Sequence, residues 1–306
     1  MPLPTLHEAY PVKLVYAGPT TVYANQLDSV EVNPGIELIE SFAAGAVDPQ
    51  LIATAFAENK VSITSRDVST LLGAISISAG LALTSSVVQW NKRADGGTFA
   101  GSGSHITLSS TGGFIYPTEI SVKQDDKEGA SIKLDLCPTW DGTNLPLVVN
   151  TSQSLVGSPA ANAVHALGPV IFEGAQLGGV QSLSVKTGIE VAFKRQDGEL
   201  YSRIVCIVKR KPMIEVELVN LGISSTLTLG KTYAVSTGTI CYLQKVTAGG
   251  ARVAVGTQEH VSFTTAAGAY RLDSMNGSKG DHANLKLTIL PTGTLACSAA
   301  AAIVIP

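Results

Sequence analysis

The amino-acid sequence predicts an all-β protein built from two tandem, duplicated antiparallel β-sandwich or barrel domains, with at most a short flanking helix. Three observations favour this fold class. A twelve-residue pattern occurs twice, and other blocks recur in the same order at nearly the same distance. The apolar residues also alternate in short runs that are separated by glycine, proline and aspartate turns.

The repeated pattern places a histidine before alternating apolar residues, hydroxyl residues and a glycine turn. It spans 105–116 (HITLSSTGGFIY) and 260–271 (HVSFTTAAGAYR), so the copies lie 155 residues apart. A second block, ASIKLDLCPT at 130–139, recurs 153 residues later as ANLKLTILPT at 283–292. Solenoid repeats are roughly 20–50 residues long, so a repeat of this length is a domain. The small drift in spacing is what insertions in loops produce.

The length of 306 residues also suits two domains of roughly 150 residues each. We expect a first domain over 1–150, a linker over 151–163 that is rich in Ser, Gly, Ala and Pro, and a second domain over 164–306. Residues 1–17 contain three prolines around a polar segment, which predicts an extended N-terminal arm on the first domain.

The first half is expected to form a series of short strands. Alternation over 22–38 is broken by the turn signal at 33–35 (Asn-Pro-Gly). Asp67 fits the N-cap of a short helix over 68–75, although a strand or a loop also fits there. The other expected elements are strands at 51–56, 61–65, 105–108, 114–122 and 131–137 and a loop at 91–97.

The second half repeats this plan. The segment 214–218 alternates cleanly, so its three apolar residues should face the core while Glu215 and Glu217 face outward. The counterpart of the helix, 220–229, carries β-branched and hydroxyl residues, which argues against a helix there. The other expected strands are 170–172, 180–185, 189–193, 200–208, 252–255, 260–263, 285–290 and 299–305.

The composition excludes some classes of function and favours self-association. A formal net charge of −3 provides no basic surface for binding nucleic acid. No apolar run reaches the ~18–20 residues of a membrane-spanning helix, and the N-terminus lacks the features of a signal peptide, so we expect synthesis in the cytosol. Only 15% of residues are charged and the mean hydropathy is +0.26, which indicates extensive surface buried against copies of the chain.

The sequence contains no catalytic or metal-binding pattern, so we expect a protein that is not an enzyme and takes no cofactor. The four cysteines form no CxxC pair and are expected to be buried free thiols. His105 and His260 occupy equivalent positions with different preceding residues, which favours a structural or interface role. The segment 101–103 lacks the third glycine of a phosphate-binding loop, and Asp125 and Asp126 are expected in a solvated turn.

Several of these segments together resemble the structural proteins of tailed bacteriophages. The resemblance rests on 105–117, 130–139 and 141–146 in the first half, and on 168–172, 179–190 and the hairpin at 197–198 in the second. Among these proteins, the chain is most similar to major tail proteins, which form the tail tube. The resemblance extends over both halves. It rests on the pattern of residues and on short stretches of similar sequence, since no active-site signature is present.

This resemblance implies a structural virion protein of the phage tail that is assembled in the host cytoplasm. In that family six β domains form a ring, and stacked rings form the conduit for DNA. Two fused domains per chain would then make a ring from three chains, a pseudo-hexamer. The implied partners are other copies of the chain, the tail terminator, tape-measure and baseplate or tip proteins, and passing DNA that is not specifically bound. No membrane is implied.

The tube interpretation also assigns surfaces. An acidic lumen would repel phosphate groups, whereas lysine and arginine would hold them. The strand glutamates expected near the lumen are Glu31, Glu37, Glu215 and Glu217. The residues expected at contacts between stacked rings are Pro4, Pro11, Asn91, Lys92 and Arg93.

Two other kinds of function stay open at this point. Another β-sandwich virion protein, such as a capsid decoration or a neck component, fits the same pattern without forming a long tube. A carbohydrate-binding module would present exposed aromatic residues, and these make up only 6% of the chain.

Overall fold

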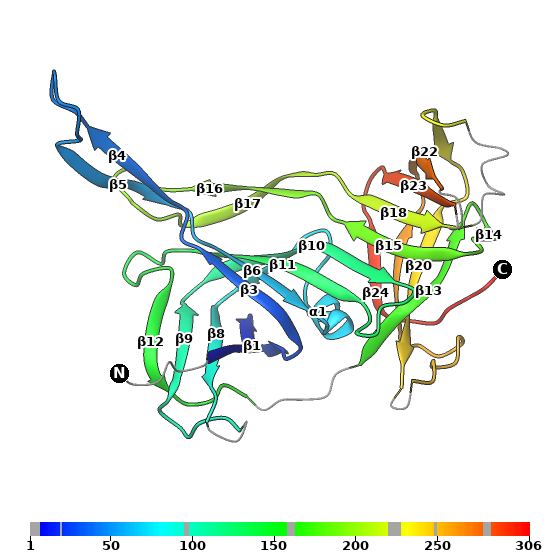
Figure 1. The fold of residues 1–306 in the computed structure, drawn as a ribbon, viewed down its shortest axis with the longest axis horizontal. Helices are drawn as coiled ribbons and strands as arrows, with labels where there is room; N and C mark the ends of the chain where they lie inside the picture. The colour runs from blue at the N-terminus through cyan, green and yellow to red at the C-terminus, as the bar shows by residue number, and fades with distance from the viewer. Residues whose placement is uncertain are drawn as a thin grey trace.

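The computed structural model describes residues 7–18, 20–94, 98–157, 163–219, 228–247, 250–277 and 283–306 (Figure 1). These residues form twenty-four β-strands and one short α-helix, and the strands pair antiparallel in every sheet. The predicted all-β class is therefore confirmed.

Each half contributes one five-stranded sheet. The order in the first half is β12 (Val148–Gln153), β9 (His105–Ser110), β8 (Ser85–Lys92), β1 (His7–Tyr16) and β2 (Thr20–Ala24). The order in the second half is β24 (Ala296–Ala301), β21 (His260–Thr265), β20 (Thr239–Val246), β13 (Val164–Phe172) and β14 (Ala175–Gln176).

The largest sheet takes strands from both halves. Its order is β19 (Thr232–Val235), β22 (Gly268–Asn276), β23 (Asn284–Pro291), β18 (Met213–Leu218), β15 (Val180–Lys186), β10 (Gly113–Lys123), β11 (Ser131–Pro138), β6 (Lys60–Ser65) and β3 (Leu27–Asn33), and β7 (Leu81–Leu83) also pairs with β10. The halves meet where β10 pairs with β15. A single apolar core runs beneath this sheet through both halves, from Val12 to Leu295.

Two hairpins extend from the largest sheet (Figure 1). β4 (Ile36–Ser41) and β5 (Leu51–Ala57) connect β3 to β6, and β16 (Ile189–Lys194) and β17 (Ile204–Arg210) connect β15 to β18. Gly35 and Gly188 precede the hairpins with φ of +55° and +57°. A Cβ atom at either position would lie 2.1 Å from a backbone carbonyl oxygen, that of Glu58 or Lys211, so both bases require glycine.

The two halves share one plan of twelve strands each. The five-stranded sheets have matching orders, and β3, β6, β11, β10 and β7 pair as β15, β18, β23, β22 and β19 do. The register shift in β3 recurs in β15 after 153 residues, and the shift in β10 recurs in β22 after 155 residues. Bulges are retained features of a fold, so their recurrence supports the common plan that the repeated sequence blocks suggested.

The predicted helix over 68–75 is present as α1 (Val68–Ala74), with Val68 and Leu71 buried. Asp67 precedes it but makes no side-chain cap. Its carboxylate instead accepts hydrogen bonds from the backbone N–H groups of Asn25 and Gln26, which fixes the turn before β3. Most of the counterpart, residues 220–227, lies outside the described residues.

The predicted N-terminal arm is wrong over residues 7–16, which form β1 between β2 and β8. Val12 and Leu14 are fully buried there, so burial of apolar residues outweighs the proline signal. Pro11 lies at a register shift between Ala9 and Val12, where a bulge tolerates a residue without an N–H group.

Other boundaries also differ from expectation. Asn91 and Lys92 end β8 rather than beginning a loop, because β1 pairs with them, and the first three linker residues complete β12. The strand expected at 252–255 is absent, since Arg252 forms only an isolated bridge with Val246. The strands expected at 200–208 and 299–305 occupy Ile204–Arg210 and Ala296–Ala301. The strands expected at 105–108, 114–122 and 131–137 are confirmed.

Because one core spans both halves, we expect the chain to unfold as one unit. Both tryptophans, Trp90 and Trp140, lie in the first half, so their fluorescence reports on that half. Leu287→Ala removes a fully buried side chain of the second half and should lower the free energy of unfolding by about 2–5 kcal/mol. The tryptophan-detected urea midpoint should therefore fall, as it should for the matched variant Leu14→Ala. An unchanged midpoint for Leu287→Ala would mean that the halves unfold separately.

Candidate assembly surfaces

The outward face of the largest sheet is polar. In β18, Ile214 and Val216 are fully buried while Glu215 and Glu217 point to the opposite face, as the alternation predicted. Facing residues on neighbouring strands share a side of the sheet. Ser184 and Thr288 lie opposite Glu215, so the polar face continues onto β15 and β23.

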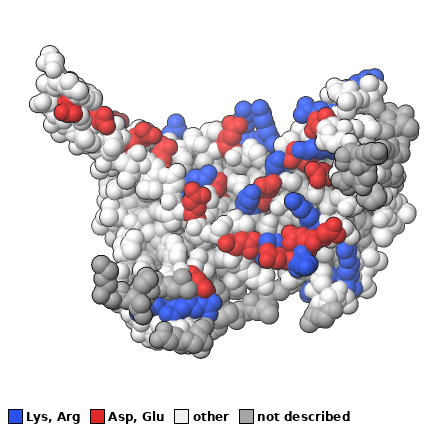
Figure 2. All heavy atoms as spheres, in the orientation of Figure 1, with Lys and Arg blue, Asp and Glu red and all other residues white. Residues whose placement is uncertain are grey.

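Ion pairs between neighbouring strands neutralise much of this face. Glu215 accepts from both Lys186 (2.5 Å) and Lys286 (2.7 Å). Glu119 of β10 accepts from Ser184 of β15 at 2.8 Å, which links the halves across their joint. Two ion pairs between neighbouring strands of the first half are Lys133 with Glu119 (3.0 Å) and Lys60 with Asp135 (2.6 Å). Figure 2 shows acidic and basic side chains intermixed on the face in view, not gathered by sign.

Two glutamates of this face have lowered pKa values. Burial alone would raise the pKa of Glu215, but hydrogen bonds and charge attraction from Lys186 and Lys286 outweigh it. Burial likewise opposes the shift at Glu119, where Lys133 and Ser184 hold the pKa below its ordinary value. Both groups are therefore stable anions within a network of partners.

The four glutamates expected near a lumen do not form one acidic field. Glu31 is exposed on the edge strand β3, and Glu217 is exposed and accepts from the hydroxyl of Ser182 at 2.8 Å. Glu215 is only 16% exposed and is neutralised by two lysines. Glu37 lies on β4, in a hairpin that stands apart from the sheet. The expected acidic surface is thus replaced by a balanced one.

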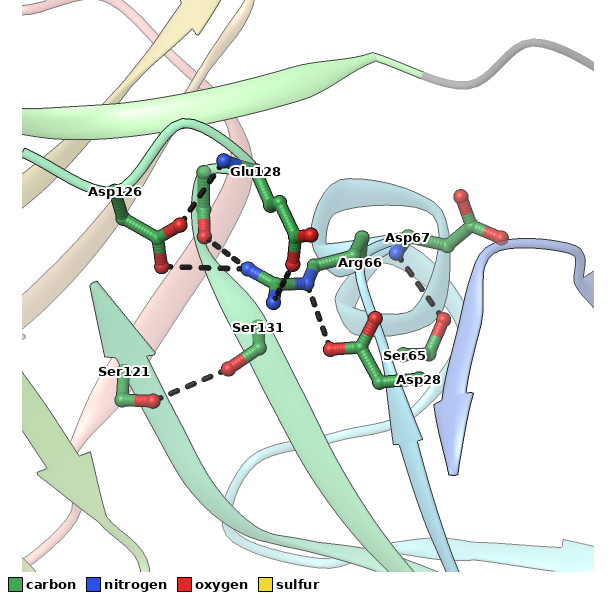
Figure 3. Close-up of polar contacts among 9 residues, drawn as sticks. Asp28, Ser65, Arg66, Asp67, Ser121, Asp126, Glu128 and Ser131 are labelled. Carbon is green, nitrogen blue, oxygen red and sulfur yellow. Dashed lines mark hydrogen bonds and ion pairs between the residues drawn. The ribbon is translucent and has the colours of Figure 1, made fainter. Parts of the chain in front are cut away.

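One end of this sheet is tied together by Arg66, which follows β6 (Figure 3). Its guanidinium contacts Asp28 of β3 (2.7 Å), and Asp126 (3.4 Å) and Glu128 (2.6 Å) in the turn between β10 and β11. It also donates to the carbonyl of Gly129 at 2.6 Å. Residues 124–128 of this turn are exposed, as expected, and Arg66 also holds the turn against the sheet.

Both ends of the largest sheet expose backbone edges. Within the described ranges β3 pairs only with β6, so no described strand covers its other edge. At the opposite end, β19 covers β22 only from Gly268 to Arg271, which leaves the edge from Ser274 to Asn276 without a partner among the described residues. Open edges are templates for pairing with another chain.

The β4–β5 hairpin is an apolar arm without cover. All six residues of β4 are exposed, as are the first four of β5. Figure 1 shows it projecting from the body of the molecule at the upper left. Its exposed apolar side chains, between 52% and 92% accessible, are Ile36, Leu38, Ile39, Phe42, Val47, Leu51 and Ile52. Exposed apolar surface of this extent marks an interaction site. A strand was predicted at 51–56, but no pattern in the sequence indicated that the hairpin stands free of the body.

The β16–β17 hairpin, in contrast, lies against the first half. The N–H of Ala57 donates to the carbonyl of Leu200 at 2.9 Å, and the N–H of Trp140 donates to that of Ser202 at 2.8 Å. The guanidinium of Arg195 stacks 4.0 Å from the ring centroid of Phe56. The tip of the β16–β17 hairpin is therefore bound by the first half of the same chain.

The residues expected between stacked rings are mostly unavailable at the surface. Pro11 and Asn91 are buried inside the chain, so the contacts predicted for them are ruled out in this fold. Lys92 and Arg93 are half-buried, and Arg93 pairs with Glu8 at 2.6 Å. Pro4 lies outside the described residues.

The repeated histidines have equivalent structural roles. Both are fully buried. Nδ1 of His105 accepts from the N–H of Lys92, and Nδ1 of His260 accepts from the N–H of Lys245, each at 3.1 Å. These bonds hold β9 to β8 and β21 to β20 at the same place in each half, which agrees with the structural role expected. His282 lies outside the described residues.

All four cysteines are free thiols, as expected, but only Cys137 and Cys241 are buried, whereas Cys206 and Cys297 are partly exposed. Burial raises the pKa of Cys241 and Cys297 to about 12. Burial, reinforced by the nearby Asp135 carboxylate, does the same at Cys137. Thiols with such pKa values are poor nucleophiles at neutral pH.

A comparison of the sequence with protein-family models and with curated proteins finds no match. Among the described residues, no helix has the length and apolar character needed to cross a membrane. No cluster of three or more His, Cys, Asp or Glu side chains suited to a metal ion occurs in the part of the chain that the structure describes. The uncovered strand edges, the balanced face and the apolar hairpin are the surface features of the described residues that bear on function.

The ion pairs of Glu215 lead to a prediction about acid stability. Because folding lowers the pKa of Glu215, its carboxylate stabilises the folded chain at pH values above its ordinary pKa of 4.5. This stabilisation is lost as the pH falls through the lowered pKa of the folded state. Glu215→Gln should therefore cost about 1 kcal/mol at neutral pH and nothing in acid. Urea titrations at neutral and acidic pH measure the difference. Glu217→Gln, which removes a more exposed carboxylate, is the control and should have a smaller effect. An equal loss at both pH values would contradict the assignment.

Proposed function

We propose that the chain is a structural virion protein that polymerises as stacked rings into the tail tube of a bacteriophage, the conduit for DNA delivery. The observation that carries this proposal is the largest sheet. It is built from both halves, has a polar outward face, and ends on either side in a strand edge that no described residue covers. Such a sheet suits lateral joining into a closed wall, because closure removes exposed edges.

The shared plan of the halves supports a ring of three chains. If the two halves arose by duplication, each chain supplies two equivalent wall segments that are already joined where β10 pairs with β15. Three chains would then give six segments. The fused joint is intramolecular, so its effective concentration is high and it needs no assembly step.

The balanced face suits a surface past which DNA moves. Double-stranded DNA is retained by lysine and arginine groups that displace its counterions. Here Lys186 and Lys286 are both committed to Glu215. Neutral pairing, in place of the acidic lumen expected from the sequence, would make such a wall neither retain nor strongly repel phosphates.

The proposal predicts hollow tubes in negative-stain electron microscopy of the concentrated full-length chain, with three chains per ring by mass. A tube with six chains per ring would keep the function and contradict the account of duplication. Replacing Leu51 and Ile52 by serine on the exposed hairpin should prevent tubes while leaving the melting temperature unchanged. If the unaltered chain forms no tubes, even when tail-tip proteins are added to nucleate assembly, the proposal fails.

Unbalancing the polar face should create DNA retention. Glu215→Gln combined with Glu217→Gln leaves Lys186 and Lys286 without their acidic partner. Assembled tubes of this variant should bind double-stranded DNA at low salt, with an affinity that falls steeply as salt rises, in a filter-binding assay. The matched control Lys186→Gln with Glu215→Gln removes one charge of each sign and should bind as weakly as the unaltered tube. Equal binding by all three would mean that this face does not meet DNA.

A further inference from the structure

The joint between the halves has a defined register. β10 pairs with β15 so that Ile120 lies opposite Val185 and Val122 lies opposite Leu183. All four side chains are at most 3% exposed. On the polar face, Glu119 lies opposite Lys186 and Ser121 opposite Ser184. The joint thus buries two apolar cross-strand pairs on one face of the sheet and places two polar pairs opposite each other on the other face.

The two strands whose edges no described residue covers, β22 and β3, are the counterparts of β10 and β15. β22 corresponds to β10. On one side β22 pairs with β23 as β10 pairs with β11, and on the other side β19 covers part of β22 as β7 covers part of β10. β3 corresponds to β15, since both bear the same register shift against β6 or β18. The shared plan places Met275 at the position of Ile120 and Val32 at that of Val185. Met275 is 45% exposed and Val32 is 37% exposed, whereas their counterparts are buried.

We infer that β22 of one copy pairs antiparallel with β3 of the next copy, with Met275 opposite Val32. This deepens the proposed function and rests on it. In this register, Ser274 lies opposite Asn33 and Asn276 lies opposite Glu31, so an amide faces a carboxylate on the polar side. The occupant of the β22 edge is a second copy of this chain. The edge of β22 is equivalent to the edge of β10, and within the chain β15 already covers the edge of β10.

One difference marks the intermolecular joint. Within the chain, the N–H of Thr187 donates to the carbonyl of Thr118 at 3.0 Å and its hydroxyl donates to that of Pro117 at 2.6 Å. The position equivalent to Thr187 beside β3 is Pro34, which has neither group. The strand pairing between copies therefore ends at Asn33.

The hairpins give an independent argument for the same neighbour. The tip of the β16–β17 hairpin binds the first half of its own chain at Ala57, through the carbonyl of Leu200. The equivalent of Leu200 in the first hairpin is Val47, which is 92% exposed. The equivalent of Ala57 is Arg210, and beside it lies a groove of about 610 Å³ between 210–213 and 290–293. The hairpin tip of the next copy fits this groove, and that copy is the one whose β3 pairs with β22.

Disulfide trapping tests the register with full-length chains. Two single variants, Val32→Cys and Met275→Cys, are mixed at high concentration, oxidised and run on a non-reducing gel. Because cross-strand side chains are closest at non-hydrogen-bonded pairs, Asn33→Cys with Ser274→Cys is tested in parallel. A covalent dimer is expected in at least one mixture. Each variant alone, and the shifted mixture Val30→Cys with Met275→Cys, should give at least about tenfold less dimer.

The outcomes separate the inference from the proposed function. Tubes in the microscope without either disulfide would leave the function standing and overturn this register. Disulfide dimers without tubes would support the strand pairing and count against the tube. Neither tubes nor dimers would overturn both. The pair Ile120→Cys with Val185→Cys in one chain forms the same contact internally and shows that the oxidation works.

A second variant tests the hairpin contact. Val47→Asp places a charge on a side chain that is exposed in the single chain, so its melting temperature should not change. Its assembly should need about a tenfold higher concentration, measured by light scattering. Val304→Asp, at another exposed apolar position, is the control and should assemble normally. Normal assembly of Val47→Asp would overturn the docking of the hairpin in the groove.

Discussion

The backbone pairing of β10 with β15 is the interaction on which the architecture depends. It joins two halves, each with its own five-stranded sheet, into one molecule with a continuous large sheet and a continuous core. The pairing is sealed on one face by fully buried aliphatic residues and on the other by the bond from Ser184 to Glu119. Without it, each half would carry two open edges of its own.

The repeated plan explains why equivalent parts of the two halves have different surroundings. The hairpin of the second half rests on the first half, while the hairpin of the first half projects with its apolar residues uncovered. The same contrast holds for Val185 and Val32. In the proposed assembly, a neighbouring copy would cover the elements of the first half whose counterparts in the second half are covered within the chain.

Much of the fold could be predicted because its signals are local. Alternation in 114–122 and 131–137 and the glycine turns identify strands directly, and the helix after Asp67 follows from its apolar spacing. The N-terminal strand was missed because Pro11 signals a break, and only its place between β2 and β8 overrides that signal. The neutralisation of Glu215 depends on the lateral order of β15, β18 and β23, which no local pattern contains. The projecting hairpin was missed because an apolar strand has the same sequence whether its own chain covers it or not.

The exchange of Thr187 for Pro34 has a mechanical consequence. In a closed wall of such chains, two kinds of seam would alternate around the circumference. Pro34 at the seam between chains could not donate the hydrogen bonds that Thr187 donates within a chain. Bending strain would concentrate at the weaker seams, so the wall would flex and finally split along lines between chains. Each chain, with its two covalently joined wall segments, would move as one rigid unit.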